Sequence, residues 1–303
     1  MLEKIKGKMK SNDVIAFTYE TVMQFVFRHF FSDERVIKRT FKKRLGRLPN
    51  LESPIMFNDK LQWLKLNWRD PIAVKCADKF EVRRFVADRI GEEYLNELIG
   101  VWESVEEIDI GKLPDRFVLK ATHGSGYNII CRDKSKMNWA VELKKLKRWL
   151  RTDYSLYGRE WVYKGIRPRI ICEKYLEEPN TGELRDYKIF CFNGEPKLIQ
   201  VDMNRFINHK RNIYDLNWNL MDCTIHYPND PTAKVERPKK LEEMLQLSAK
   251  LSSGFPHVRV DFYYVEDSIV FGELTFFHGN GTQRILPVDF EVEMGNWLKL
   301  PPL

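Results

Sequence analysis

The sequence predicts an α+β fold with antiparallel sheets. Two observations lead to this class: the first hundred residues show helical periodicity, and the chain from Phe117 onward is dominated by short β-type segments. These strands follow one another at hairpin spacing, and helices are expected among them only at 138–151 and 239–252. Strands that pair with their sequence neighbours form antiparallel sheets, whereas strict alternation of strands and helices would favour a parallel sheet.

Length and composition describe a folded, globular protein. The chain has 303 residues, of which 43% are hydrophobic, 13% aromatic and 31% charged. This length suggests about two domain-sized units, and the composition excludes a low-complexity or fibrous chain. No uncharged apolar stretch approaches the roughly 20 residues of a membrane span, and we expect no secretion signal at the start of the chain. The five cysteines include no C-x-x-C pair, so we expect reduced cysteines in a cytoplasmic protein.

Net positive charge is concentrated at the start of the chain. Residues 1–50 contain 12 Lys and Arg against 5 Asp and Glu, which accounts for the whole net charge of +7. An anionic partner is therefore expected for this segment: a membrane surface, a polyanionic glycan or nucleic acid. Apolar residues at steps of three and four predict an amphipathic helix over 12–31, followed by a basic helix that stops near Gly46.

Two interpretations of this basic segment stay open. In the first, the apolar stripe docks on the body of the protein and the basic residues face solvent. In the second, the segment attaches to an anionic membrane leaflet, where each basic residue contributes about 1 kcal/mol. Nucleic acid is not expected, because the aromatic residues lie on the apolar stripe rather than among the basic residues. The stripe consists of Ile15, Tyr19, Val22, Val26 and Phe30.

The body of the chain shows helices first and strands later. Residues 57–70 predict a second amphipathic helix, with Leu61, Leu64 and Trp68 on one face, and residues 78–98 predict one or two more helices. The expected strands are FVLKA, NIICR, IRPRIICEKY, DYKIFCF, EPKLIQVD, HVRVDFYY and SIVFGELTF. The dipeptide Asn193-Gly194 predicts a tight hairpin between DYKIFCF and EPKLIQVD.

The last two strands contain the strongest chemical signal. A three-residue loop centred on Asp267 would place Asp261 opposite Glu273 and Arg259 opposite Thr275, with all four side chains on one face. Two carboxylates directly across a ladder repel each other unless a cation lies between them. Oxygen ligands favour a hard divalent ion, and a Mg²⁺ that holds substrate phosphates needs only one or two protein carboxylates. A solvated pair, or a pair neutralised by the arginine, is the alternative.

A glycine-containing hairpin is a candidate phosphate site. The segment FVLKATHGSGYNIIC contains a strand that ends near Lys120 and the loop His123-Gly124-Ser125-Gly126. Backbone N–H groups of such a loop can contact phosphate oxygens while Lys120 supplies a positive charge. The segment matches neither a Walker A loop nor a dinucleotide fingerprint, and Ser125 lacks the G-x-S-x-G context of a hydrolase nucleophile. An ordinary turn is the alternative.

Two further strands contain charged residues in positions where ligands could bind. Glu173 lies at the polar end of an apolar strand, where a linker between two lobes could read the edge of a base such as adenine; a surface residue is the alternative. Asp186 and Lys188 share one face of the strand DYKIFCF, so they can jointly contact a phosphate or a metal. An ordinary ion pair is the alternative there.

Taken in order, these segments resemble the ATP-grasp fold, in which two α+β subdomains grip ATP. FNDKLQWLKL, ADKFEVRRF, FVLKATHGSG, DYKIFCFNGEPK, VRVDFYY and FGELTF are similar to the ATP-grasp subgroup related to the teichuronopeptide biosynthesis protein. The resemblance runs from about Phe57 to Asp289. It implies a helical region over 57–112, a lid subdomain over 113–175 and a C-terminal subdomain with the metal site over 176–303, and these follow the basic helical N-terminal segment that charge and periodicity predict over 1–56.

The resemblance also implies how the nucleotide is bound. Lys79 and Lys120 match the two lysines that hold the α- and β-phosphates of ATP, and the loop 123–126 matches the flexible phosphate lid. The adenine-binding hinge corresponds to Glu173, Lys174 and Tyr175.

The same resemblance implies a reaction centre on the later strands. Lys188, with Asp186 beside it, matches the basic residue that contacts the γ-phosphate, and Arg259 matches an arginine near an acyl phosphate, so Lys188 and Arg259 are the expected catalytic residues. Asp261 and Glu273 match the metal carboxylates. Many ATP-grasp ligases have Glu-x-Asn where this chain has Glu273-Leu274-Thr275, so the third metal ligand is Thr275, Asn280 or water.

The implied function is an ADP-forming carboxylate–amine ligase that uses ATP and Mg²⁺ and acts through an acyl phosphate. The subgroup's association with bacterial surface polysaccharides implies a uronic acid of a capsular or cell-wall polysaccharide, or its precursor, as the acceptor, and an amino acid or amine as the donor. The expected location is the cytoplasm, with peripheral contact at the inner face of the membrane through the basic N-terminus. Segments 151–169 and 205–227, rich in aromatic and basic residues, are candidates for the acceptor site.

Two alternatives to the ligase differ in their chemistry. The first is a kinase of the same fold that phosphorylates a glycan or sugar without an amine. The second is a non-catalytic glycan- or membrane-binding protein, against which the paired Asp261 and Glu273 beside phosphate-binding lysines argue.

Overall fold

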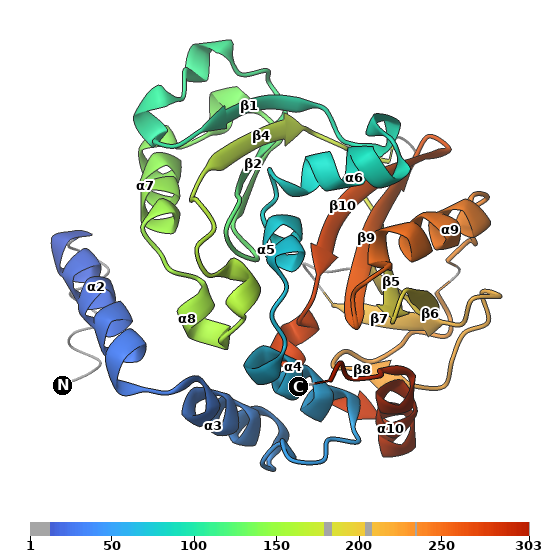
Figure 1. Cartoon of the computed structure of the whole chain (residues 1–303). Helices are drawn as coiled ribbons and strands as arrows, with labels where there is room; N and C mark the ends of the chain where they lie inside the picture. The colour runs from blue at the N-terminus through green and yellow to red at the C-terminus, as the bar shows by residue number, and fades with distance from the viewer. Residues whose placement is uncertain (1–12, 179–183, 204–207, 234, 303) are drawn as a thin grey trace.

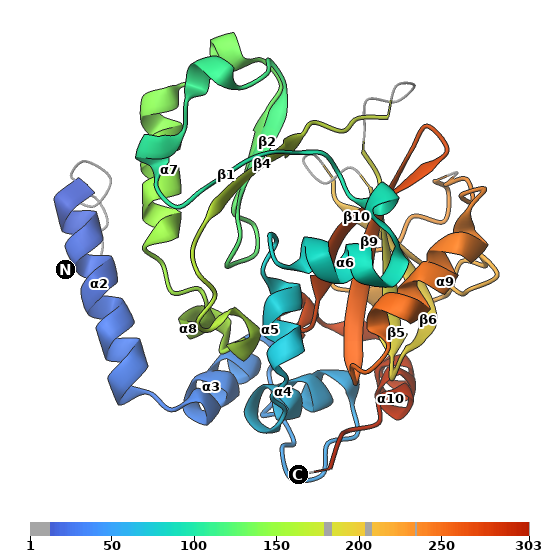
Figure 2. The ribbon, with the colours of Figure 1, turned by 45° about the horizontal axis from the view of Figure 1, so that its top comes forward.

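The computed structural model describes residues 13–178, 184–203, 208–233 and 235–302. The helices are α2 (Asp13–Phe30), α3 (Asp33–Leu45), α4 (Phe57–Asn67), α5 (Pro71–Ala77), α6 (Val82–Ile90), α7 (Trp139–Leu150), α8 (Ser155–Gly158), α9 (Leu241–Ser252) and α10 (Val288–Trp297). Figures 1 and 2 show two separate β-sheets with α5 and α6 between them, α7 beside the smaller sheet and α9 beside the larger one. A short 3₁₀ turn, η6 (His278–Gly281), follows the last long strand. The predicted mixed architecture of helices and antiparallel sheets is confirmed.

The smaller sheet has four antiparallel strands in the order β1-β4-β2-β3. Its strands are β1 (Leu98–Trp102), β2 (Phe117–Ala121), β3 (Asn128–Cys131) and β4 (Ile170–Lys174). Alternate side chains such as Phe117, Leu119 and Cys172 are fully buried in one apolar cluster with Leu146 of α7. Strand β1 lies within 57–112, a range for which only helices were expected.

The larger sheet has five antiparallel strands in the order β10-β9-β5-β6-β7. Its strands are β5 (Asp186–Phe192), β6 (Glu195–Met203), β7 (Lys210–Tyr214), β9 (His257–Val265) and β10 (Ser268–Thr275), while β8 (Thr224–Ile225) and β11 (Ile285–Leu286) pair separately. Helix α9 covers one face through buried residues that include Leu247 and Leu251. Every residue of β5 is buried, so its charged side chains on the other face are also shielded from water.

Two hairpins of the larger sheet are tight. Asn193 and Gly194 both have positive φ, at 51° and 86°, so the predicted Asn-Gly hairpin is confirmed. The last hairpin differs from its prediction, because Ser268 pairs with Val265 and leaves a two-residue loop instead of a three-residue one. A shift in register at Gly272 then compensates for the missing residue.

The bulge at Gly272 restores the predicted pairing of the charged residues. Beyond it, Asp261 pairs with Glu273 and Arg259 pairs with Thr275. A Cβ atom at position 272 would lie 3.0 Å from the carbonyl oxygen of Asp261, which is tight for any side chain. A bulge therefore re-aims Glu273, as bulges next to functional sites often do.

Helix α4 has a buried polar stripe in addition to its apolar face. Asn58, Gln62 and Lys65 recur at steps of four and three and are at most 1% exposed. Asn58 Nδ2 donates to a carboxylate of α10 at 2.7 Å, Gln62 Nε2 donates to the carbonyl of Gly281 at 2.6 Å, and Lys65 Nζ donates to the carbonyl of Asn280 at 2.9 Å. The helix thus fixes η6 directly after the strand that carries Glu273.

Helix α2 stands at the edge of the molecule and exposes apolar side chains. Val22, Phe25 and Phe30 are 53%, 55% and 68% exposed, and Figure 1 shows the helix apart from both sheets. Its attachment includes polar contacts, among them the ion pair between Arg28 and Asp153 at 2.9 Å. The prediction that the apolar stripe docks on the body is therefore wrong for Val22 and Phe30.

The neighbouring helix α3 follows its prediction. It begins after Ser32, whose hydroxyl accepts from the backbone N–H of Arg35, and it ends at Gly46, which has φ 80°. Residues 1–12 and the side chains of Ile15 and Tyr19 lie outside the part of the chain that is described. Among the described helices, none has both the length and the apolar content to cross a membrane.

Candidate functional site

A narrow cleft lies between the polar faces of the two sheets. Lys120 and Glu173 line it from the four-stranded sheet, and Phe271 and Gly272 line it from the five-stranded sheet. Lys79, from the segment between α5 and α6, lies at the same place. The free volume is about 10 Å³, about the size of a single water site, so a ligand here must displace side chains that now contact one another.

The four-stranded sheet contributes an ion pair to the cleft. Lys120 Nζ lies 2.6 Å from Glu173 Oε2, and Arg83 of α6 lies 3.5 Å from the other carboxylate oxygen. All three side chains are less than one-fifth exposed. Such pairs are strong in a shielded environment but can exchange for a phosphate group, which binds lysine equally well.

The glycine loop lies over Lys79. Lys79 Nζ donates to the carbonyl oxygen of Gly124, and the backbone N–H of Lys79 donates to the carbonyl of Thr122. Gly126 has φ 76°, which favours glycine at this position. Ser125 and Gly126 are exposed. The loop therefore presents its backbone beside two lysines, as a phosphate site requires.

His123 differs from the rest of this loop. It is 3% exposed, and its Nε2 lies 2.8 Å from the carbonyl oxygen of Trp149. Burial lowers the pKa of His123 below its ordinary value, which favours the neutral ring. These contacts favour a role in holding the loop against α7 rather than direct contact with a phosphate.

The remaining hinge residues face away from the cleft. Lys174 and Tyr175 line a separate cavity of about 500 Å³ together with Arg116 and Ile99. The guanidinium of Arg116 lies 4.3 Å from the centre of the Tyr175 ring. The structure therefore brings Lys79, Lys120 and Glu173 together but places the side chains of Lys174 and Tyr175 elsewhere.

Lys188 lies at the centre of an acidic cluster on the five-stranded sheet. Its Nζ is 2.6 Å from Asp186, 3.7 Å from Asp202 and 3.6 Å from Asp261. The sheet pairing explains this arrangement, because Lys188 on β5 is directly opposite Asp261 on β9. A buried cation that touches three carboxylates has a fixed position, since any movement breaks one of these contacts.

Arg259 connects the two paired carboxylates. Its Nε and Nη2 donate to the two oxygens of Asp261 at 2.7 and 2.6 Å. The same Nη2 lies 3.5 Å from Glu273 and 3.2 Å from the hydroxyl of Thr275, which itself donates to Glu273 at 3.1 Å. The structure therefore places four of the expected reaction-centre residues, Arg259, Asp261, Glu273 and Thr275, in one network.

Electrostatics separate the two carboxylates of this network. Burial raises the pKa of Asp261, although Arg259 and Lys188 oppose the effect. Burial acts in the same direction on Glu273, but the charges of Lys79, Arg259 and Lys188 outweigh it and hold the pKa of Glu273 below its ordinary value. Glu273 is therefore the carboxylate that stays ionised most readily, and its side chain is 37% exposed.

The donor set fits a Mg²⁺ ion that takes most of its ligands from phosphates and water. Asp261 and Glu273 supply two carboxylates and Thr275 a hydroxyl, all hard oxygen donors. Within the described ranges, no group of three or more His, Cys, Asp and Glu side chains forms a site that would hold a metal without substrate. Asn280, the other candidate ligand, accepts a hydrogen bond from Lys65 through its side-chain oxygen, which disfavours coordination of a second cation.

Three residues of the site were missed by the sequence analysis: Arg83, Asp202 and Arg211. Arg83 contacts Glu173, and its signal was its place in ADKFEVRRF, four positions after Lys79. Asp202 and Arg211 lie opposite each other on β6 and β7 and are joined by a 2.7 Å ion pair. Alternation along EPKLIQVD places Asp202 on the face of Gln200, but nothing in the sequence relates that face to Lys188.

The architecture is that of the ATP-grasp class of protein. Two antiparallel sheets place lysines opposite each other, one sheet carries a glycine loop, and the other carries a carboxylate pair. Residues 59–299 match the family described as TupA-like ATPgrasp. The chain belongs to this family, whose name refers to teichuronopeptide biosynthesis.

Solved structures show likeness at low sequence identity. A D-alanine–D-alanine ligase from Bacillus anthracis, in complex with ATP, is 14% identical with a TM-score of 0.40, and the match covers 80% of this chain and 64% of the ligase. The ligase of the same name from Helicobacter pylori is 12% identical with a TM-score of 0.44, and the match covers 81% and 69% of the two chains. The ATP-grasp ligase PsnB, in complex with a precursor variant, Mg and ADP, is 12% identical with a TM-score of 0.41 over 80% and 66%. A comparison with curated protein sequences finds no match.

Proposed function

We propose that this protein is an ADP-forming carboxylate–amine ligase that uses ATP and Mg²⁺. In this proposal it amidates a uronic acid of a bacterial surface polysaccharide, or of its precursor, with an amino acid or amine. The observation that carries the proposal is the network of Lys188, Arg259, Asp261 and Glu273 on one sheet, opposite Lys79 and Lys120. Membership of the TupA-like family supports the polysaccharide acceptor.

The chemistry requires two steps because a carboxylate has a poor leaving group. In the first, a carboxylate oxygen of the acceptor attacks the γ-phosphorus of ATP, and ADP leaves with the electrons of the broken P–O bond, which gives an acyl phosphate. In the second, the amine nitrogen attacks the acyl carbon, inorganic phosphate leaves with the electrons of the C–O bond, and the nitrogen loses one proton to solvent. Both steps develop negative charge that fixed positive groups stabilise.

Each part of the cleft has a role in these steps. Lys79 and Lys120 neutralise the α- and β-phosphates, and Glu173 accepts from the base once Lys120 has moved to a phosphate. Lys188 and Arg259, both bound to Asp261, would contact the γ-phosphoryl group as it passes to the carboxylate. Mg²⁺, held by Asp261 and Glu273, would neutralise phosphate charge as the transfer proceeds. The loop 123–126 closes over the phosphates and keeps water from the acyl phosphate.

The proposed reaction is tested by nucleotide turnover. The purified full chain is incubated with ATP and Mg²⁺, with an oligogalacturonate, an oligoglucuronate or neither, and with or without a panel of amino acids and amines, and ADP, AMP and phosphate are measured. We expect ADP and phosphate to rise only when both acid and amine are present. ADP formation that needs no amine and gives a stable phosphorylated product would establish a kinase instead, and failure to bind ATP would overturn the nucleotide site.

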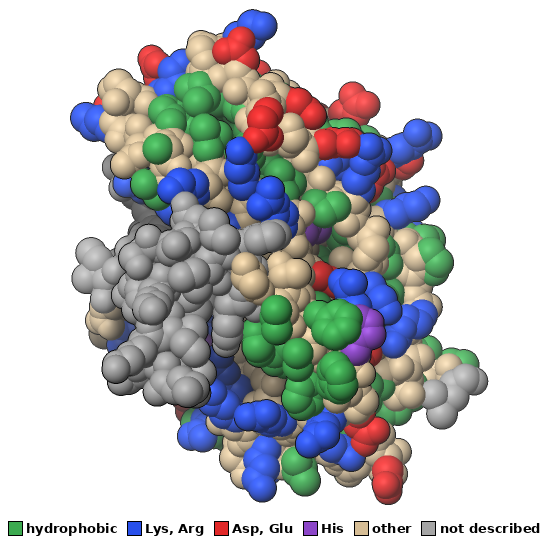
Figure 3. Space-filling model, turned by 90° about the vertical axis from the view of Figure 1, so that its left-hand side faces the viewer, with side chains coloured by type: hydrophobic (Ala, Val, Ile, Leu, Met, Phe, Trp, Pro, Cys, Tyr) green, Lys and Arg blue, Asp and Glu red, His purple; other side chains and the backbone are tan. Residues whose placement is uncertain are grey.

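We also propose a peripheral contact between α2 and an anionic lipid surface. The exposed Val22, Phe25 and Phe30 offer an apolar face, and residues 1–50 supply seven more basic than acidic residues. Figure 3 shows the side of the molecule on which α2 lies, with Lys and Arg side chains spread among hydrophobic ones. A short apolar face combined with basic residues is typical of helices that lie in the membrane interface.

A further inference from the structure

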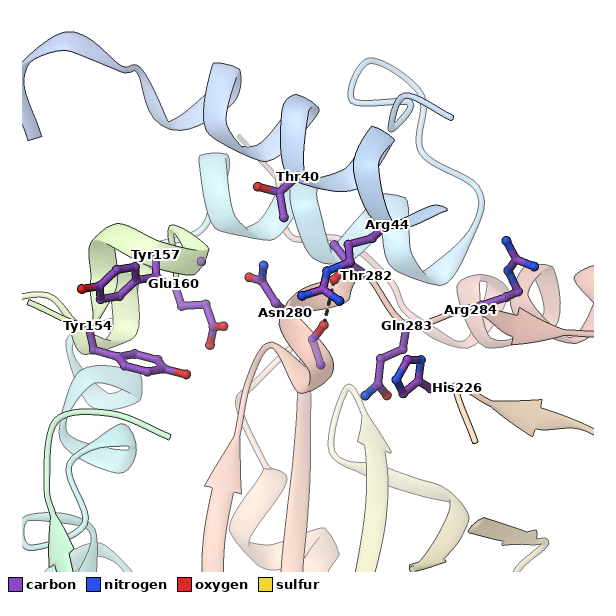
Figure 4. A pocket seen from close by; sticks show the side chains of 12 residues that line it. Thr40, Arg44, Tyr154, Tyr157, Glu160, His226, Asn280, Thr282, Gln283 and Arg284 are labelled. Carbon is purple, nitrogen blue, oxygen red and sulfur yellow. Dashed lines mark hydrogen bonds between the residues drawn. The ribbon is translucent and has the colours of Figure 1, made fainter. Parts of the chain in front are cut away.

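A second, larger cavity lies beside the reaction centre. Its volume is about 640 Å³, within the range of about 300–1,000 Å³ that is usual for ligand sites. It is bounded by α3, by the segment around α8, by the loop after β8 and by η6 with the residues that follow it (Figure 4). We call it the α3–α8 pocket. Segments far apart in the sequence therefore build a single cavity that the cleft between the sheets does not include.

Polar contacts connect the floor of this pocket to Lys188. The side-chain oxygen of Gln283, which lines the pocket, accepts from Arg211 Nη1 at 3.2 Å. Arg211 Nε donates to Asp202 at 2.7 Å, and Asp202 lies 3.7 Å from Lys188 Nζ. Only two side chains thus separate the pocket from the cation that we place at the γ-phosphate.

The opposite wall of the pocket contacts the phosphate loop. Tyr154 packs so closely on Gly124 that a Cβ atom there would lie 2.9 Å from the ring. The charges of Glu160 and Glu273 add to burial in raising the pKa of Tyr154, which is consistent with a ring near both the pocket and the carboxylate pair. A molecule in the pocket therefore lies between the phosphate loop and η6, which follows the strand that carries Glu273.

The pocket presents cations that have no partner among the described residues. Arg44 points down from α3 toward Asn280 and Gln283 in Figure 4, and Arg284 lies at the rim. Neither side chain forms a hydrogen bond or ion pair within the described part of the chain, whereas Arg211 on the floor is bound to Asp202. Unpaired guanidinium groups that face a cavity recognise carboxylates or phosphates in bidentate geometry.

The one carboxylate among the residues that line the pocket, Glu160, lies near the buried cation Lys65. Glu160 is 8% exposed, and burial raises its pKa, while the charge of the buried Lys65 opposes this effect. Lys65 Nζ also donates to the carbonyls of Gly158 and Asn280 at 2.9 Å each. Glu160 therefore does not cancel the positive charge of Arg44 and Arg284.

The rest of the lining is suited to a carbohydrate. The rings of Tyr154 and Tyr157 provide flat apolar surfaces with hydroxyl groups at their edges. Asn280, Thr282 and Gln283 supply amide and hydroxyl groups that can donate to or accept from sugar hydroxyls. The lining therefore suits a sugar that has both hydroxyl groups and an acidic group. The aromatic rings and neutral polar groups can contact the sugar ring and its hydroxyls, and the free guanidinium groups can bind the acidic group.

We infer that the α3–α8 pocket binds the acceptor of the reaction, an acidic saccharide, and that Arg44 of α3 recognises a carboxylate of this saccharide. The identification of this ligand as the acceptor rests on the proposed ligase function. The binding site itself rests on the cavity, its unpaired arginines and its contacts with both halves of the cleft. The basic helix α3 thereby contributes a specificity-determining residue, which neither family membership nor sequence pattern assigns.

Direct binding tests this inference without turnover. Calorimetric titration of the full chain with a galacturonic acid trisaccharide is compared with the neutral maltotriose, in wild type, in Arg44→Gln and in the matched control Arg39→Gln, which changes an exposed arginine on the same helix outside the pocket. We expect micromolar-to-millimolar binding of the acidic trisaccharide, at least tenfold weaker binding in Arg44→Gln, and less than a twofold change in Arg39→Gln. Maltotriose binding as tight as that of the acid, an unchanged affinity in Arg44→Gln, or no binding to wild type would each overturn the inference.

A parallel titration with ADP and Mg²⁺ separates this inference from the proposed function. If ADP binds and the acidic trisaccharide does not, the pocket inference is wrong while the nucleotide site stands. If the trisaccharide binds with the expected dependence on Arg44 and ADP does not, the pocket is a saccharide site and the ligase proposal is wrong. Because Arg44 is exposed, its replacement by Gln leaves the fold intact, and equal unfolding midpoints for the two arginine variants check this.

Discussion

The two sheets that face the cleft contain similar charged groups but hold them differently. On the four-stranded sheet, Lys120 has one carboxylate partner, Glu173, with Arg83 nearby. On the five-stranded sheet, Lys188 and Arg259 share a continuous network of carboxylates in which each cation has several partners. A network with many partners fixes positions, whereas a single pair can exchange for a ligand. The comparison therefore distinguishes a rigid network at the proposed reaction centre, on the five-stranded sheet, from an exchangeable ion pair at the proposed nucleotide site, on the four-stranded sheet.

The largest effect is expected for Glu273→Gln in the rigid network. The change removes one negative charge at the proposed Mg²⁺ site but keeps a side chain that can accept from Thr275. We expect the rate of ADP formation at saturating substrates to fall at least about a hundredfold, because phosphoryl transfer is accelerated mainly by fixed charges around the reacting phosphate. Glu266→Gln, an identical change in the exposed turn of the same hairpin, is the control and should leave the rate unchanged. An undiminished rate in Glu273→Gln would remove the carboxylate pair from the reaction centre.

A smaller effect of a different kind is expected for Lys120→Gln on the four-stranded sheet. Loss of a charged hydrogen bond to phosphate, worth about 1.5 kcal/mol, predicts about tenfold weaker ATP binding. The rate at saturating ATP should change less than the affinity. Calorimetric titration with ATP measures the affinity, and Lys136→Gln, an exposed lysine of the same half, is the control. A loss of rate that exceeds the loss of affinity would reverse the comparison between the sheets.

The buried charges of Glu160 and Lys65 predict a pH effect on stability. Burial raises the pKa of Glu160 to about 7 and lowers the pKa of Lys65 to about 8, and each group opposes the shift of the other. From about pH 4.5 to about pH 7, folded Glu160 keeps a proton that the unfolded chain has lost. The free energy of unfolding contributed by Glu160 therefore falls as pH rises through this window.

Glu160→Gln should remove this dependence. We expect the free energy of unfolding of the wild type to fall by about 2 kcal/mol more than that of Glu160→Gln between about pH 5 and pH 7. Urea unfolding at both pH values measures it, and Glu52→Gln, at an exposed position, serves as the control. Parallel pH profiles for wild type and Glu160→Gln would mean that Glu160 is ionised in the folded protein throughout.

The smallest effect is expected far from both sheets, at Phe30→Ser on α2. Phe30 is 68% exposed, so its replacement should leave turnover with soluble substrates unchanged. Sedimentation with vesicles that contain phosphatidylserine should show about threefold weaker binding, because part of the apolar contact is lost. Ile55→Ser replaces another exposed apolar residue outside α2 and should bind the vesicles as wild type does. Equal binding by Phe30→Ser would contradict contact of α2 with the lipid surface.

Local patterns predicted the strands and their pairing well. Alternation and turn residues gave the Asn193-Gly194 hairpin and the opposition of Asp261 to Glu273. The length of the last loop was predicted wrongly, but the predicted pairing of Asp261 with Glu273 was still correct. A two-residue turn and a bulge at Gly272 together give the same register as the expected three-residue loop. Pairing within a hairpin depends on neighbours in sequence, which is why it could be predicted.

Helical periodicity was less informative, as α2 and α4 demonstrate. Both read as amphipathic, but α2 leaves Val22 and Phe30 exposed, while α4 buries its polar residues as well as its apolar ones. Gln62 and Lys65 both have hydrogen-bond partners in η6, more than two hundred residues away. Burial of a polar side chain depends on such distant partners, and no local pattern specifies them. Segments 151–169 and 205–227, named from the sequence as candidates for the acceptor site, supply Tyr154, Tyr157 and His226 to the α3–α8 pocket. The contribution of α3 to that pocket was not predicted, for the same reason.

The single pair between Lys120 and Glu173 has a consequence for which molecules the cleft accepts. A phosphate that takes Lys120 leaves Glu173 with Arg83 at 3.5 Å as its nearest cation and with an oxygen free to accept from a base. Inorganic triphosphate would leave that oxygen of Glu173 without a donor. A nucleoside alone would not separate Lys120 from Glu173, so Glu173 would not be free to accept from its base. In the proposed binding mode we therefore expect the two ends of the nucleotide to bind cooperatively, so that one exchangeable contact favours the intact nucleotide over either of its fragments.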